Sequence, residues 1–110
     1  MRRVLIFVAL LPPAVPLTLG FSADAAQPRV HRILMANMRF GPVPEGIKAG
    51  DVILWVNRDM VRHTASARDG SFDVDLPARQ SRRMTVRRAG SIAFYCRYHP
   101  GMRGVLVAAR

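Results

Sequence analysis

The sequence contains a single cysteine, Cys96, so no disulfide can form within the chain and a disulfide-stapled domain is excluded. Acidic residues are also scarce, because 7 Asp and Glu stand against 17 Lys and Arg, which gives a formal net charge of +10. The longest apolar run of the N-terminal segment, residues 4–11, ends at Pro12 and is shorter than the roughly 20 residues needed to cross a bilayer. We therefore predict no integral membrane span in the mature protein.

The first 25 residues have the layout of a secretory signal peptide rather than of a fold. Two arginines follow Met1, an apolar run covers residues 4–11, and residues 23–25 (Ala-Asp-Ala) offer small side chains for cleavage before Ala26. We predict a cleavable signal peptide at residues 1–25, export to the periplasm, and one domain at residues 26–110. The alternative is an uncleaved membrane anchor.

The predicted mature domain is small for a chain without disulfides. A domain of roughly 85 residues is marginally stable on its hydrophobic core alone, and exported domains of this size usually add disulfides or a bound metal. Because disulfides are excluded here, the size of the domain favours a contribution from metal.

The excess of arginine does not predict a nucleic-acid-binding protein. The basic residues are scattered, their densest pairs being Arg82-Arg83 and Arg87-Arg88, and neighbouring residues of a strand point to opposite faces. The plain interpretation is a solvated basic surface. The functional interpretation is long-range attraction toward an acidic protein partner or an anionic membrane surface.

Short strand patterns fill the predicted domain, and none of its segments has the periodicity of an amphipathic helix. In residues 51–57, Val52, Leu54 and Val56 alternate with Ile53 and Trp55, so both faces are expected to be covered. Similar patterns mark the strands that we predict at residues 30–35, 51–57, 81–86, 91–96 and 105–108, with weaker ones near Ile47 and at residues 71–74. Residues 58–76 are otherwise expected to be irregular. The pattern predicts an all-β sandwich or barrel.

A thiol, an imidazole and a thioether follow one another at intervals of three residues, as Cys96, His99 and Met102. Pro100 and Gly101 disfavour a helix, so we predict a tight loop between two adjacent strands. Thiolate and thioether suit Cu(I), and imidazole suits both oxidation states of copper. The trio therefore predicts a copper site that needs a fourth donor.

His63 is the expected fourth donor, contributed by a different segment. Each residue has another interpretation when taken alone: Cys96 as a small buried hydrophobe, His63 as a solvated residue and Met102 as core filler. Their joint occurrence favours copper over zinc, for which methionine is a poor ligand. The remaining histidine, His31, is expected to be an exposed strand residue.

Two segments of the sequence resemble the cupredoxins, the plastocyanin and azurin family of type 1 blue copper proteins. Residues 50–64 (GDVILWVNRDMVRHT) are similar to the segment that carries the first ligand, and residues 90–104 (GSIAFYCRYHPGMRG) to the ligand loop. The two-residue gaps between Cys, His and Met are closest to the amicyanin pattern. The loop departs from that pattern at Arg97 and Tyr98, where we expect an effect on potential and partner choice.

The resemblance implies a Greek-key β-sandwich and one copper ion that cycles between Cu(II) and Cu(I). It implies that the ligands are His63, Cys96, His99 and Met102, and that Asn57 ties the first-ligand segment to the cysteine loop. It also implies an electron portal at the edge of His99, for which the apolar residues Met60, Val61 and Pro100 are candidates.

The function expected from these residues is that of a periplasmic electron carrier and not an enzyme. The expected partner is an acidic redox protein, such as a c-type cytochrome or a periplasmic dehydrogenase, and the expected state is a monomer with no nucleic-acid partner. Arginines close to the ligands in sequence are expected to favour Cu(I). The alternative is a protein for copper trafficking, which delivers copper to an oxidase.

Overall fold

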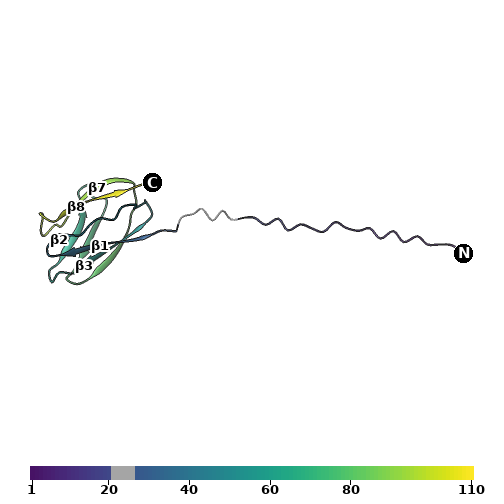
Figure 1. The fold of residues 1–110 in the computed structure, drawn as a ribbon, viewed down its shortest axis with the longest axis horizontal. Coiled ribbons are helices and arrows are strands. Elements are labelled where there is room, and N and C mark those ends of the chain that lie inside the picture. The colour runs from purple at the N-terminus through teal and green to yellow at the C-terminus, as the bar shows by residue number, and fades with distance from the viewer. Residues whose placement is uncertain (21–26) are drawn as a thin grey trace.

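The computed structural model describes residues 1–20 and 27–110, and its regular structure is a β-sandwich (Figure 1). Residues 1–20 form an exposed segment without helix or strand that extends away from the sandwich. The predicted cleavage site at residues 23–25 lies outside the described residues. Within those residues, no helix has the length and apolar character required to cross a membrane.

Eight strands in the described part of the chain form two four-stranded sheets. In chain order they are β1 (Val30–Ala36), β2 (Arg39–Phe40), β3 (Val52–Asn57), β4 (His63–Ala67), β5 (Asp73–Leu76), β6 (Ser81–Thr85), β7 (Gly90–Tyr95) and β8 (Arg103–Ala108). The first sheet has the order β2-β1-β3-β6, with β1 parallel to β3, and the second has the order β5-β4-β7-β8, all antiparallel. The connections that cross between the sheets give the interleaved order expected of a Greek-key sandwich, and the all-β prediction is confirmed.

An aromatic cluster fills the space between the sheets. The Phe94 ring of β7 packs edge-on against Phe40 at 4.8 Å and against Trp55 of β3 at 5.2 Å between centroids. Gly104 of β8 pairs with Phe94, and a Cβ atom at this glycine would lie 2.5 Å from the Phe94 ring. The Phe94 ring therefore lies over the Gly104 backbone, between β7 and β8, the two strands that hold the ends of the 96–102 loop.

The segment from residue 58 to 76 differs from its prediction at β4, which was expected to be irregular, whereas β5 overlaps the weak strand predicted at residues 71–74. All five residues of β4, His-Thr-Ala-Ser-Ala, are buried, so this strand shows neither apolar alternation nor large apolar side chains. The prediction for β3 was half right. Ile53 and Trp55 are buried, whereas Val52, Leu54 and Val56 on the other face are only partly buried.

Candidate metal centre

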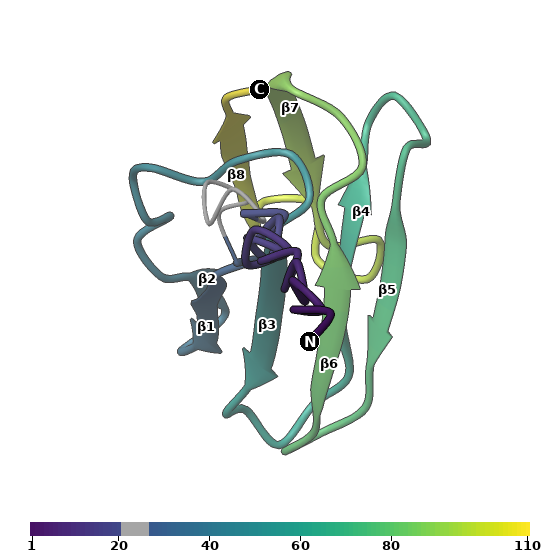
Figure 2. The same ribbon diagram turned by 90° about the vertical axis from the view of Figure 1, so that its right-hand side faces the viewer.

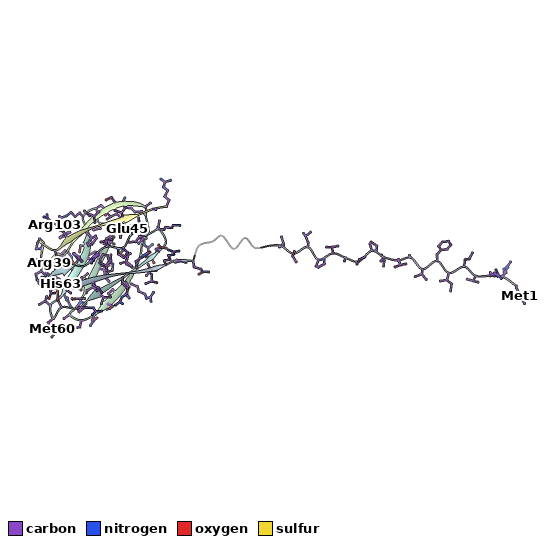
Figure 3. The ribbon with its side chains drawn as sticks, viewed as in Figure 1. Met1, Arg39, Glu45, Met60, His63 and Arg103 are labelled. Carbon is purple, nitrogen blue, oxygen red and sulfur yellow. The ribbon has the colours of Figure 1, made fainter. Side chains whose placement is uncertain are left out.

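The 96–102 loop joins β7 to β8 at one end of the sandwich, as the sequence predicted. Two backbone hydrogen bonds close it, since the Cys96 amide donates to the Met102 carbonyl at 3.0 Å and the Met102 amide donates to the His99 carbonyl at 2.8 Å. His63 opens β4, the strand that lies beside β7 in the same sheet. Figure 3 shows His63 at the end of the sandwich far from the N-terminal segment, where Met60, Arg39 and Arg103 also lie.

Three donor atoms converge between this loop and β4. His63 Nδ1 lies 3.3 Å from His99 Nδ1, and the Cys96 Sγ atom lies 3.8 Å from His63 Nδ1 and 3.6 Å from His99 Nδ1. His63 and Cys96 are completely buried, and His99 is partly buried. Among the residues that the structure describes, these three form the one group of His, Cys, Asp and Glu side chains close enough to hold an ion.

Met102, the fourth predicted donor, ends the same loop and is 3% exposed. It belongs to the buried core cluster that includes Cys96. The loop therefore keeps the thioether away from solvent on the same side of the molecule as the other three donors.

A carboxylate that the sequence analysis did not single out orients His63. Asp59 Oδ2 lies 2.7 Å from His63 Nε2, and the same carboxylate accepts hydrogen bonds from the amides of Asn37 and Met38 in the turn between β1 and β2. Partial burial alone would raise the pKa of Asp59, but the hydrogen bonds from His63, Met38 and Asn37 hold it below its ordinary value. An ionised Asp59 accepts a hydrogen bond from the Nε2–H group of His63, which leaves the unprotonated Nδ1 free to act as a ligand.

Thr64 connects β4 to the cysteine loop. Its amide donates to Cys96 Sγ at 3.3 Å, and its hydroxyl oxygen accepts a hydrogen bond from the Arg97 amide at 2.9 Å. The hydroxyl also bonds to Ser66, which donates to Asp73 at 2.6 Å. Thr64 of the buried strand β4 thus holds the thiol and the start of the loop in place. In the sequence, only the position of Thr64 next to His63 could have indicated this role.

Asn57 has a different role from the one the resemblance implied. Its side-chain amide donates to the carbonyls of Val61 and Leu76, and its Oδ1 accepts the Asp59 amide at 2.9 Å. These bonds shape residues 57–63 and attach them to the end of β5. The amide and hydroxyl of Thr64, rather than the side chain of Asn57, bond to Cys96 and Arg97 of the cysteine loop.

His31 lies outside the donor cluster, and the prediction that it is exposed was wrong. Its side chain is 11% exposed, and its Nε2 lies 2.9 Å from Asp51 Oδ2. The Asp51 carboxylate also accepts hydrogen bonds from the amides of Arg29 and Lys48. The hydrogen bonds from His31, Arg29 and Lys48 lower the pKa of Asp51 to about 2.

The fold and the donor cluster together define a β-sandwich protein with a two-histidine, one-cysteine site at one end. The chain belongs to the family of cupredoxin-like domains, whose family model matches residues 7–108. This confirms the resemblance found in the sequence.

The relatives most similar to the chain include amicyanins. The chain is 31% identical over 67 residues to amicyanin from Paracoccus versutus, a match that covers 56% of this chain and 51% of the relative, so the chain spans about half the length of that protein. The crystal structure of amicyanin from Paracoccus versutus superimposes with a TM-score of 0.59 and 29% identity over 78% of this chain and 86% of the other. The Cu(I) form of an amicyanin variant gives a TM-score of 0.59 and 26% identity over 78% and 87% of the two chains.

Proposed function

We propose that this chain is an exported type 1 copper protein that carries single electrons between redox partners in the periplasm. Residues 1–25 would be its signal peptide and residues 26–110 its copper-binding domain. The proposed ligands are His63, Cys96, His99 and Met102. The observation that carries the proposal is the convergence of three buried or partly buried donor atoms, with separations of 3.3, 3.6 and 3.8 Å.

These separations fit a single ion in a trigonal plane. With bonds like those of zinc, about 2.0 Å to nitrogen and about 2.3 Å to sulfur, trigonal donors are about 3.5 Å apart for two nitrogens and about 3.7 Å for nitrogen and sulfur. The observed values lie within a few tenths of an ångström of these distances. Two imidazoles and a thiolate in a plane, with a weak axial methionine, are the donor set of blue-copper sites.

The chain's own residues hold this arrangement rigid. When bound, copper would supply reversible one-electron chemistry through its two oxidation states. Asp59 fixes the His63 ring, the Thr64 amide binds the Cys96 sulfur, and two backbone bonds close the loop around His99. Burial of His63, Cys96 and Met102 keeps bulk water from the donors. A site held this way changes little when an electron arrives or leaves.

His99 is the proposed portal for electrons, because it is the donor with the most solvent exposure among the three clustered side chains. Exposed apolar residues adjoin the ligands in the chain: Met60, which is 73% exposed, Val61 and Pro100. Such an apolar rim would let a partner approach the ring edge and exclude water from the contact.

The proposed partner is an acidic redox protein, such as a c-type cytochrome or a periplasmic dehydrogenase. Of four arginines close to the ligands in sequence, Arg62 is paired with Asp75 at 3.5 Å and Arg97 with Asp73 at 3.3 Å. Arg58 and Arg103 are exposed and have no acidic partner within the described part of the chain. These two arginines would therefore supply most of the local positive field that attracts the partner.

Copper trafficking is the alternative, and the burial of the site argues against it. A protein that hands copper to an oxidase needs donors that another protein's ligands can reach. Cys96 is fully buried and Met102 is 3% exposed, so exchange of copper would require the loop to open.

The proposed function is tested by adding Cu(II) to the purified mature domain and recording its visible spectrum and voltammogram. An intense thiolate-to-copper band with reversible one-electron reduction is the expected result. Replacing Cys96→Ser should abolish the band. A pale complex, or a protein that binds Cu(I) alone, would contradict electron transfer and favour trafficking.

A further inference from the structure

Two buried hydroxyl groups lie on one face of β4, close to the metal centre. Thr64 is completely buried and Ser66 is 4% exposed, and alternation along the strand places both on the face opposite to the core residue Ala65. Ser66 pairs in register with Asp73 of β5, which Figure 2 shows as the outermost strand beside β4. Buried hydroxyls need hydrogen-bond partners, so the polar groups around them decide how they are oriented.

The two hydroxyls belong to a closed ring of polar contacts. The Arg97 amide donates to Thr64 Oγ1 at 2.9 Å. The Thr64 and Ser66 oxygens are 2.9 Å apart, and the Ser66 hydroxyl donates to Asp73 Oδ1 at 2.6 Å. The Arg97 Nε atom lies 3.3 Å from the same carboxylate oxygen. Arg97 therefore enters the ring twice, through its backbone amide and through its side chain.

The carboxylate of Asp73 determines the direction of these hydrogen bonds. Each hydroxyl has one proton, and a carboxylate can only accept. Because Ser66 gives its proton to Asp73, Thr64 must be the donor in the bond between the two hydroxyls. Its oxygen then presents lone pairs to the Arg97 amide. Without the carboxylate, the two hydroxyls could satisfy only one of their two protons by bonding to each other, and an unsatisfied buried donor is costly.

We propose that Asp73 is a positioning residue of the metal centre, which acts through Ser66 and Thr64. It orients the two hydroxyls so that Thr64 holds the Arg97 amide, and this amide belongs to the peptide that follows the Cys96 ligand. The effect on copper rests on the proposed function, whereas the ring of contacts requires no bound ion. The ion pair is the lesser part, since the Asp73 and Arg97 side chains are about half exposed and such pairs contribute little.

Asp75 provides a matched control on the same strand. Its carboxylate lies 3.5 Å from the Arg62 guanidinium, and both of these side chains are also about half exposed. Each aspartate is thus paired with an arginine that adjoins a proposed ligand in the chain, Arg62 beside His63 and Arg97 beside Cys96. What distinguishes Asp73 is the hydrogen bond that it accepts from Ser66.

The first test is amide hydrogen exchange, followed by NMR on the purified protein in its metal-free and Cu(I)-loaded forms. Asp73→Ala should make the Arg97 amide exchange about tenfold faster, because the hydroxyl that protects this amide loses its fixed orientation. Asp75→Ala removes the same charge and should leave the rate within about twofold of the parent. Asp73→Asn should restore slow exchange, since a carboxamide oxygen can accept the Ser66 proton.

A double-variant comparison tests the path from Asp73 to the loop. Ser66→Ala should accelerate exchange at Arg97 as much as Asp73→Ala does. The variant with both substitutions should show no further increase, because each substitution interrupts the same chain of hydrogen bonds. Additive accelerations would contradict a path through Ser66.

The second test is the visible spectrum of the Cu(II)-loaded variants. Asp73→Ala should shift the thiolate-to-copper band, because the peptide after Cys96 is held less firmly, whereas Asp73→Asn and Asp75→Ala should keep the wavelength of the parent. An unshifted band in Asp73→Ala would overturn the positioning role.

Two exchange results would also overturn the proposal. Equal acceleration at Arg97 in Asp73→Ala and Asp75→Ala would assign the effect to charge, and fast exchange in Asp73→Asn would assign it to the ion pair. A parent protein without the thiolate-to-copper band would instead refute the proposed electron carrier. In that case the exchange rates of the metal-free variants would still support or overturn the orientation of the hydroxyls by Asp73.

Discussion

Two histidine–aspartate pairs lie at opposite ends of the sandwich and have similar local geometry. His63 Nε2 lies 2.7 Å from Asp59 at the metal centre, and His31 Nε2 lies 2.9 Å from Asp51 at the start of β3. Each carboxylate also accepts two backbone amides, those of Asn37 and Met38 at Asp59 and those of Arg29 and Lys48 at Asp51. In both places the pair fastens one strand to the chain beside it.

The difference between the pairs lies in what surrounds the second ring nitrogen. His63 Nδ1 faces His99 and the Cys96 sulfur from a fully buried position, whereas no comparable donor group surrounds His31 in the described part of the chain. A histidine–aspartate pair therefore stabilises the local structure in either setting. It becomes part of a metal centre only where the fold brings two further donors within about 4 Å of the ring.

Removing one histidine from each pair gives the largest expected contrast. His63→Ala should abolish the intense thiolate-to-copper band, because only Cys96 and His99 of the three clustered donors remain. His31→Ala should keep the band at its original wavelength, since its ring is not among the donors. The measurement is the visible spectrum of both variants after addition of one equivalent of Cu(II). A full loss of the band in the His31 variant would refute this division of roles.

The sequence was sufficient to locate the donors but not the groups that hold them. Cys96, His99 and Met102 form a pattern of residue types and spacing, with Pro100 and Gly101 marking the loop, so their proximity could be predicted without the fold. The alternating apolar residues of β3 and β7 likewise predicted those strands. Such signals are local in the chain.

The partners of the donors could not be predicted, because they depend on contacts between distant segments. Thr64 acquires its role by meeting Cys96, 32 residues away, and the Asp59 carboxylate, although only four residues from His63, is held in place by the turn at Asn37, 22 residues away. Thr64 lies in β4, whose buried residues include no large apolar side chain, so this strand carries no apolar periodicity. The burial of His31 could not be predicted, because it depends on Asp51, which lies 20 residues away at the start of the neighbouring parallel strand.

Replacing the aspartate of each pair by asparagine should change copper affinity in one case and not in the other. Asp59→Asn should weaken copper affinity by about 10- to 100-fold, because the amide no longer fixes the His63 ring with Nδ1 unprotonated. Asp51→Asn is the matched control and should leave copper affinity unchanged. Competition with a chelator of known affinity measures both. Equal losses in the two variants would mean that Asp59 acts through general stability and not through the ring.

The remote pair should control acid stability. The folded-state pKa of Asp51, about 2, is below the value of about 3.9 for an unfolded aspartate. Its ionised form therefore contributes stability that is complete above pH of about 4 and is lost as the pH falls toward 2. In urea titrations from pH 5 to 2, the difference between the parent and Asp51→Asn should shrink steadily on acidification. A difference that is constant with pH would exclude ionisation of Asp51 as its origin.

Charges at the two ends of the sandwich should affect the reduction potential unequally. Of the effects predicted here, this shift in potential is the smallest. Arg58→Gln and Arg103→Gln each remove an exposed positive charge close in sequence to a proposed ligand, which should lower the potential by an amount on the order of 10 mV. Arg87→Gln removes the same charge at the opposite end of the sandwich. Salt screens an exposed charge beyond a Debye length of about 10 Å, so this variant should leave the potential unchanged. Voltammetry at low and high ionic strength separates the two cases, because added salt should reduce the shifts at Arg58 and Arg103. Equal shifts in all three variants would show that the potential responds to net charge and not to the field at the metal end.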